Sequence, residues 1–160
     1  MIARFELSRR FKRPVISVRC GGGVFLALID TGAVVPVCTL ESDEIAALGA
    51  RLLRDGINIS GIGGVSKGSL YHMDIPFSIF RYIDLPVIRI DEPSMPFDFI
   101  FSATMFTGFR YVIDTQAHAL TIETCANETK FHLRIADNIG GFRVLIAEQE
   151  GTASRVWPAA

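Results

Sequence analysis

Cysteine is scarce in this sequence and shows no pairing pattern. The three cysteines, Cys20, Cys38 and Cys125, are widely spaced and form no CxxC pair. An odd number of scattered thiols does not make a disulfide framework and is typical of a reducing compartment. Because no histidine lies near Cys38 in the sequence, we interpret this residue as a small core side chain and not as a nucleophile.

Long apolar runs and an excess of basic residues are also missing. No run approaches the roughly 20 residues that cross a bilayer, and residues 1–13 contain no apolar core of signal-peptide length. The formal net charge of −1 argues against nucleic acid as a ligand, because phosphate binding needs a basic excess. We therefore expect a cytoplasmic protein that binds neither nucleic acid nor a membrane. The local exception, which we interpret as a solvated strand end or turn, is Arg9, Arg10, Lys12 and Arg13.

Metal-binding and phosphate-binding patterns are absent as well. His72, His118 and His132 are scattered and lack the spacing of metal ligands. The glycine-rich segment at 61–64 (GIGG) is not followed by a helix that begins with Lys-Ser or Lys-Thr, so it does not match a phosphate-binding loop. We expect no metal and no cofactor.

The composition is that of one apolar domain. The chain has 160 residues, of which 49% are hydrophobic, and a mean hydropathy of +0.35. This length is enough for a core, and the apolar excess suggests that some surface is buried against a partner. We expect a single domain over residues 1–150, with a core at about 14–123 and extra C-terminal strands at 131–147. Residues 151–160 are expected to form a loose tail.

Short segments of strand-like sequence, separated by turn residues, predict a mostly-β domain of barrel or sandwich type. A glycine-rich tip at 61–64 predicts a hairpin over residues 56–70. A change of period over residues 39–53 predicts one short helix, capped by Ser42 and weakened at Gly49. A helical turn is expected at 102–106. The other strands are expected at 3–8, 14–19, 24–29, 71–79, 85–90, 97–101, 111–114, 120–123, 131–135 and 142–147.

The segment around which the chain is organised is residues 24–37 (VFLALIDTGAVVPV). Its apolar run stops abruptly at Asp30, and three small residues follow. A carboxylate in such a place is costly unless it is hydrogen-bonded or used in chemistry. The small residues allow the backbone to turn tightly and bring its N–H groups close to the carboxylate.

Three features in this order and spacing resemble the retropepsin-like aspartic proteases. They are the Asp-Thr-Gly sequence at residues 30–32, the GIGG hairpin tip about thirty residues later, and the apolar segment Ile100-Phe101-Ser102 before a short helix. The resemblance covers about residues 14–122. It implies a closed-barrel-like acid-protease fold with one or two short helices, a flap formed by the hairpin, and a homodimer that cleaves a protein or peptide substrate.

The resemblance also implies the catalytic roles. Asp30 of each copy would supply one carboxylate of a dyad, since this family builds one active site from two chains. Two carboxylates held that close cannot both ionise easily, so they share a proton. Thr31 would hydrogen-bond across the two-fold axis, and Gly32 would offer its backbone N–H to the carboxylate. Asp114-Thr115-Gln116 is not a second catalytic loop, because Gln116 lacks the conformational freedom of glycine.

Substrate contacts are implied for Ala33 and for the hairpin tip, Gly61, Ile62, Gly63 and Gly64. Ile62 would be an apolar contact, and the neighbouring glycine amides would lie near the substrate backbone. Ala33 has no hydroxyl, whereas relatives with serine there donate a further hydrogen bond to the aspartate, so a less acidic optimum is expected here.

Two departures from the family pattern leave alternatives open. Retroviral members usually carry acidic residues where this chain has Val34-Val35. Ser102 stands where the family has glycine, and a glycine-type backbone angle would be strained there. The alternatives are a non-catalytic dimerisation or binding module with this fold, and a regulatory processing protease of narrow specificity.

Overall fold

The structure is a computed structural model that describes residues 2–61, 64–77, 80–107, 109–123, 131–139, 142–149 and 155–158. Strands dominate the described chain, as predicted, together with one α-helix and one 3-10 helix. The elements are β1 (Ile2–Glu6), β2 (Val15–Cys20), β3 (Gly23–Asp30), β4 (Val37–Cys38), α1 (Ser42–Ala47), β5 (Arg51–Gly61), β6 (Gly64–Phe77), β7 (Phe80–Ile90), β8 (Phe99–Ser102), the 3-10 helix η1 (Ala103–Phe106), β9 (Arg110–Asp114), β10 (Ala119–Glu123), β11 (Phe131–Ile139), β12 (Phe142–Gln149) and β13 (Arg155–Pro158).

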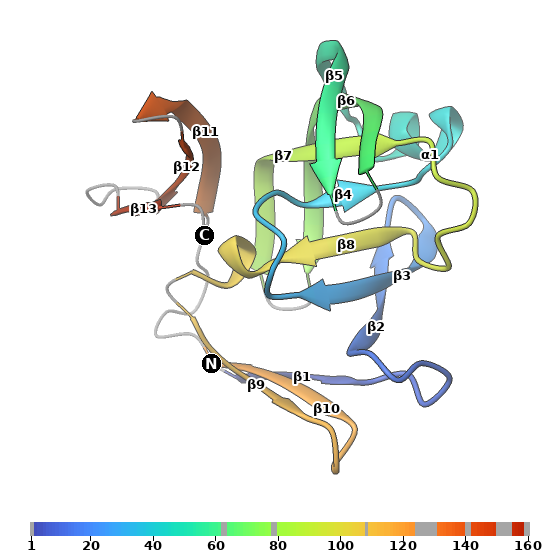
Figure 1. Cartoon of the computed structure of the whole chain (residues 1–160). Coiled ribbons are helices and arrows are strands. Elements are labelled where there is room, and N and C mark those ends of the chain that lie inside the picture. Colours follow the sequence, from blue (N-terminus) through green and yellow to red (C-terminus); the bar gives the residue numbers. More distant parts are fainter. Residues whose placement is uncertain are drawn as a thin grey trace.

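The strands form two sheets. A ten-stranded sheet contains the order β13-β12-β11-β7-β4-β8-β3-β2, with β6 paired to β7 and β5 paired to β6. A three-stranded sheet has the order β1-β10-β9 and lies below the larger sheet in Figure 1. The predicted mostly-β class is confirmed, and no closed barrel is detected among the described strands.

The β2–β3 hairpin carries β3 into the interior. Gly21 and Gly22 have positive φ angles of 54° and 81°, a conformation that suits glycine in a tight turn. β2 alternates between buried and exposed positions, whereas β3, which lies between β2 and β8, is buried at Phe25 and at the consecutive residues 27–29. The unbroken apolar run at 24–29 therefore reflects a strand in the middle of a sheet.

The predicted helix is shorter than the sequence suggested. It begins at Ser42 and ends at Ala47, with Glu41 and not Ser42 at its N-cap. The backbone N–H of Glu41 donates to the Glu44 carboxylate at 2.8 Å. Gly49 has a φ of 65°, which ends the helix, and Leu52 belongs to β5 with half of its surface exposed.

Aromatic side chains fill the core beneath the larger sheet. Phe77 at the end of β6 is fully buried, and its ring centroid lies 5.6 Å from that of Phe101 in β8 and 4.8 Å from that of Phe5 in β1. Tyr82 in β7 is also buried, and its hydroxyl donates a hydrogen bond to the carbonyl oxygen of Met105 in η1. These contacts join both sheets and η1 into one core.

The first and last described strands both belong to the sheets. β1 pairs with β10 from Ile2↔Glu123 to Glu6↔Ala119. β11, β12 and β13 form an antiparallel group that joins the larger sheet through a parallel pairing of Phe131 with Tyr82. Residues 155–158 form β13, so this part of the expected loose tail is a strand. The division of the chain at residue 150 stays a prediction.

Candidate active site

Asp30 is the last residue of β3 and lies at the start of a tight turn. The Gly32 N–H donates to Asp30 Oδ1 at 2.9 Å, the hydrogen bond expected from the sequence. The Ala33 N–H donates to the backbone oxygen of Asp30 at 3.2 Å. A Cβ atom at Gly32 would lie 3.3 Å from Asp30 Oδ1, closer than most such contacts. A glycine at this position thus lets the backbone approach the carboxylate. Thr31, the residue between Asp30 and Gly32, is exposed.

β8 supports this turn from the interior. β3 and β8 run parallel, with Asp30 opposite Ser102, and Figure 1 shows the two strands side by side and ending on the same side of the sheet. Ser102 is buried, and its φ of −79° and ψ of 155° are ordinary extended values. The glycine-type angle considered from the sequence is therefore not required, and the serine fits without backbone strain.

A second set of hydrogen bonds, which sequence reasoning missed, joins the residues just before β8 to β3 and, separately, to Thr39 after β4. Asp98 Oδ2 accepts from the Leu26 N–H at 2.7 Å, and the Asp98 N–H donates to the Leu26 oxygen at 2.9 Å. Thr39 donates through its N–H to the Asp98 oxygen at 3.0 Å and through its hydroxyl to the Phe97 oxygen at 3.0 Å. The available signal was a lone aspartate inside the apolar segment 97–101, because such a carboxylate needs donors.

Asp114 has a structural role in the turn between β9 and β10. Its Oδ1 accepts from the N–H groups of Gln116 at 3.0 Å and Ala117 at 2.8 Å. The side chain is exposed and is used by its own turn. This geometry agrees with the interpretation that Asp114 does not supply a second catalytic carboxylate within the chain.

The β5–β6 hairpin is present where the glycine-rich tip predicted it, but longer. Gly61 pairs with Gly64, whose φ of 112° suits glycine. The other two predicted contact residues of the tip, Ile62 and Gly63, lie outside the described residues. Gly68 is the first residue of β6 that pairs with β7, and a Cβ atom there would lie 2.6 Å from the Arg89 backbone oxygen. The hairpin is therefore closely packed onto β7 at this residue.

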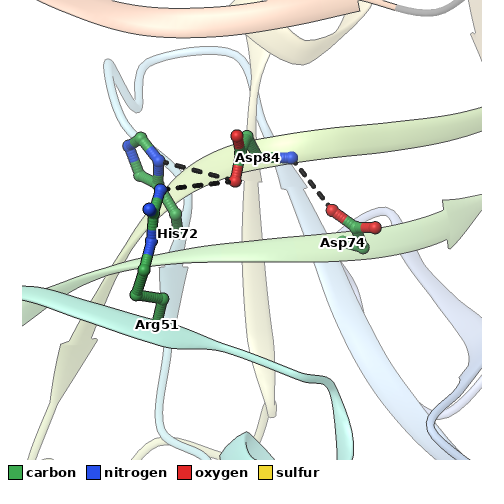
Figure 2. Close-up of polar contacts among 4 residues, drawn as sticks. All are labelled: Arg51, His72, Asp74 and Asp84. Carbon is green, nitrogen blue, oxygen red and sulfur yellow. Dashed lines mark hydrogen bonds and ion pairs between the residues drawn. The ribbon is translucent and has the colours of Figure 1, made fainter.

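A polar cluster lies at the base of this hairpin, where β5, β6 and β7 meet (Figure 2). Asp84 has a positive φ of 53° and donates its backbone N–H to Asp74 Oδ1 at 3.0 Å. Its carboxylate lies 3.7 Å from the Arg51 guanidinium and 3.8 Å from His72 Nδ1. That nitrogen is buried and has no hydrogen-bond partner among the described residues. Burial lowers the pKa of His72, and Arg51 lowers it further, although Asp84 partly opposes this shift.

The lowered pKa of His72 predicts a pH-dependent stability. The unfolded chain binds the proton more tightly than the folded chain, so the free energy of unfolding should fall as pH drops through the range below the ordinary histidine value of about 6.5. A His72→Gln variant should lose less stability than the wild type when pH changes from about 7.5 to about 5.5. Urea unfolding at both pH values measures the difference.

An Asp84→Asn variant provides the matched comparison for His72. Asparagine tolerates the positive φ, but it removes the charge that favours protonated His72, so the loss of stability at low pH should become larger. Equal pH dependence in the wild type and the His72→Gln variant would contradict the interpretation of the cluster.

The buried thiols do not offer a second chemistry. Burial raises the pKa of Cys20 to about 11, with a smaller contribution from Asp98, and burial also raises the pKa of Cys38 to about 12. Both thiols are therefore protonated and weakly nucleophilic at neutral pH.

The described residues contain no cluster of His, Cys, Asp or Glu suited to a metal ion. No helix in the described part of the chain has the length and apolar character to cross a membrane.

The two sheets give the chain a mostly-β fold, with the Asp30 turn at the end of an interior strand. No family model and no curated protein sequence matches the chain. Among solved structures, the chain is similar to a retropepsin-like aspartic protease from Rickettsia conorii, with a TM-score of 0.51. That alignment covers 78% of this chain and 91% of the other, at 12% sequence identity. At this identity the similarity establishes a shared fold.

Proposed function

We propose that the chain is an aspartic endopeptidase that is active as a homodimer. The observation that carries the proposal is the Asp30 turn, in which an aspartate at the end of an interior strand accepts the Gly32 N–H and is supported by β8. A fold shared with a retropepsin-like aspartic protease adds support. The alternative, a non-catalytic module, gives no reason for the Asp-Thr-Gly sequence at this strand end.

The proposed chemistry needs two carboxylates. One Asp30 would take a proton from a water molecule while the Asp30 of the second copy gives a proton to the carbonyl oxygen of the substrate. The water oxygen bonds to the carbonyl carbon as these protons move, which gives a tetrahedral intermediate. The C–N bond then breaks as the first Asp30 passes the proton it took from water to the amide nitrogen, and a hydroxyl of the intermediate returns a proton to the second Asp30 as the carboxylic acid product forms. A two-fold symmetric dimer would bring two identical turns together at its axis, with Thr31 of each copy bonded across it.

The hairpin would close over the bound peptide in this proposal. Ala33, Gly61 and Gly64 would contact the substrate together with the tip residues Ile62 and Gly63. Half-buried Val34 and Val35 follow the catalytic turn, so we propose apolar side chains on both sides of the cleaved bond. A cytoplasmic location is also part of this proposal.

The test is cleavage of a mixed peptide library over a range of pH, together with binding of a pepstatin-type inhibitor and sedimentation of the free protein. We expect cleavage that the inhibitor blocks, in a sample that is largely dimeric. A dimer that neither cleaves nor binds the inhibitor would support the non-catalytic alternative. Inhibitor binding and cleavage of only one cellular protein would support a processing protease of narrow specificity.

Ala33 gives a prediction about the pH optimum. A serine hydroxyl at this position would donate to the Asp30 carboxylate and favour its ionised form. The Ala33→Ser variant should therefore move the acidic limb of the pH–rate profile of kcat/KM to lower pH, and Ala33→Gly serves as the control without a hydroxyl. An unchanged profile in the serine variant would contradict the expected contact.

A further inference from the structure

Two hydroxyl groups next to the Asp30 turn form a short hydrogen-bonded chain. Ser102 Oγ lies 2.6 Å from Thr104 Oγ1, and Thr104 Oγ1 lies 3.2 Å from the backbone oxygen of Val34. Ser102 is buried, and within residues 2–123, where the structure describes burial, it is the only serine, threonine or charged residue that is. A buried hydroxyl is costly without a partner, so the contact with Thr104 is needed for this serine to be accommodated.

The direction of the hydrogen bonds follows from the number of protons. The Val34 carbonyl is only an acceptor, so the single hydroxyl proton of Thr104 must be given to it. The contact of 2.6 Å therefore uses the hydroxyl proton of Ser102, with Thr104 as the acceptor. The hydrogen bonds therefore run in one direction: the Ser102 hydroxyl donates to Thr104, and the Thr104 hydroxyl donates to the Val34 carbonyl.

This series of hydrogen bonds connects the two sides of the turn that holds Asp30. Ser102 pairs with Asp30 itself across β3 and β8, and Val34 lies in the loop that follows the turn. The Gly32 N–H, which bonds to the Asp30 carboxylate, lies between Asp30 and Val34 in the sequence. Moving the Val34 carbonyl would therefore move the backbone that carries this N–H.

We propose that Ser102 and Thr104 are positioning residues that set the orientation of the Asp30 carboxylate. They act through the Val34 carbonyl and the Gly32 amide, and neither contacts the substrate. This inference rests on the proposed function only for its effect on catalysis, because the effect on the Asp30 turn exists in the free protein. A small misplacement of a catalytic group lowers the rate of the chemical step more than it weakens substrate binding.

The test uses Thr104→Val, which keeps the shape of the side chain and removes the hydroxyl. In the free protein, the exchange rate of the Gly32 amide should rise on the order of tenfold, because that amide reports the bond to Asp30. In the active protein, kcat should fall about 10-fold to 100-fold with little change in KM. Thr104→Ser restores a hydroxyl and should recover most of both values.

Thr39→Val is the matched control. Thr39 is also half-buried and also donates its hydroxyl to a backbone carbonyl, that of Phe97 at 3.0 Å, but it lies outside the Asp30 turn. We expect Thr39→Val to lower stability to a similar extent without changing Gly32 exchange. Equal Gly32 exchange in the Thr104→Val and Thr39→Val variants would overturn the proposal. If the wild type cleaves no peptide, the proposed function fails, and the exchange measurement still tests the positioning role.

Discussion

Replacing Asp30 with asparagine is expected to lower kcat for peptide hydrolysis by about a thousandfold or more. Base and acid roles each contribute about 100-fold to 10,000-fold, and the variant removes the group proposed for both. Asparagine has nearly the same shape and keeps an oxygen that accepts the Gly32 N–H, so the turn should stay folded. Initial rates of peptide cleavage measure the effect, with the dimer content of each sample checked by sedimentation.

Asp114→Asn is the control for this substitution. Asp114 also ends a strand, precedes a threonine and accepts backbone N–H groups through Oδ1. It therefore presents the same local chemistry outside the proposed site, and its replacement should leave the cleavage rate nearly unchanged. Full activity in the Asp30→Asn variant, or a comparable loss in Asp114→Asn, would contradict the assignment of Asp30.

Mixing wild-type and Asp30→Asn chains separates a shared site from a site within one chain. If each site needs Asp30 from both copies, activity should fall with the square of the wild-type fraction, to about one quarter at equal amounts. A site within a single chain would instead give a linear decrease to about one half. The experiment requires time for the subunits to exchange before the rates are measured.

The strand and turn that hold Asp30 could be predicted because their signals are local. An apolar run that ends at a charged residue and is followed by small residues indicates where an interior strand stops. The hairpin tip was equally local, since glycines around a short turn mark its position. Each signal spans only a few neighbouring residues, and the backbone geometry follows from them.

The hydrogen-bond partners that fix the strand and turn around Asp30 could not be predicted, because they come from distant parts of the sequence. The Thr104 hydroxyl and the Val34 carbonyl are 70 residues apart, and Asp98 and the Leu26 amide are 72 residues apart. Serine and threonine at such positions have no distinguishing local pattern, so only the pairing of β3 with β8 brings them together. The helix predicted over residues 39–53 was too long for a related reason, since the apolar spacing of the sequence continues past Gly49 into β5.

Replacing Phe77 with alanine is expected to cost about 3–5 kcal/mol of stability, the range for a large aromatic removed from a core. Phe77 is fully buried, and its ring lies within 6.1 Å, centroid to centroid, of Tyr82 and Phe106, in addition to its contacts with β1 and β8. The cavity would therefore loosen both sheets and η1 together. Because domains of this size have only about 5–15 kcal/mol of stability, the variant should be near its unfolding threshold. Urea unfolding followed by circular dichroism measures the change.

Two further variants decide whether this loss comes from the cavity. Phe77→Leu keeps much of the side-chain volume, so it should cost clearly less than the alanine variant, since the penalty grows with the volume left empty. Val65→Ala removes an apolar side chain that is 71% exposed on the β5–β6 hairpin, and it should change stability by less than about 0.5 kcal/mol. If Phe77→Ala cost no more than Val65→Ala, Phe77 could not be the residue that joins the two sheets.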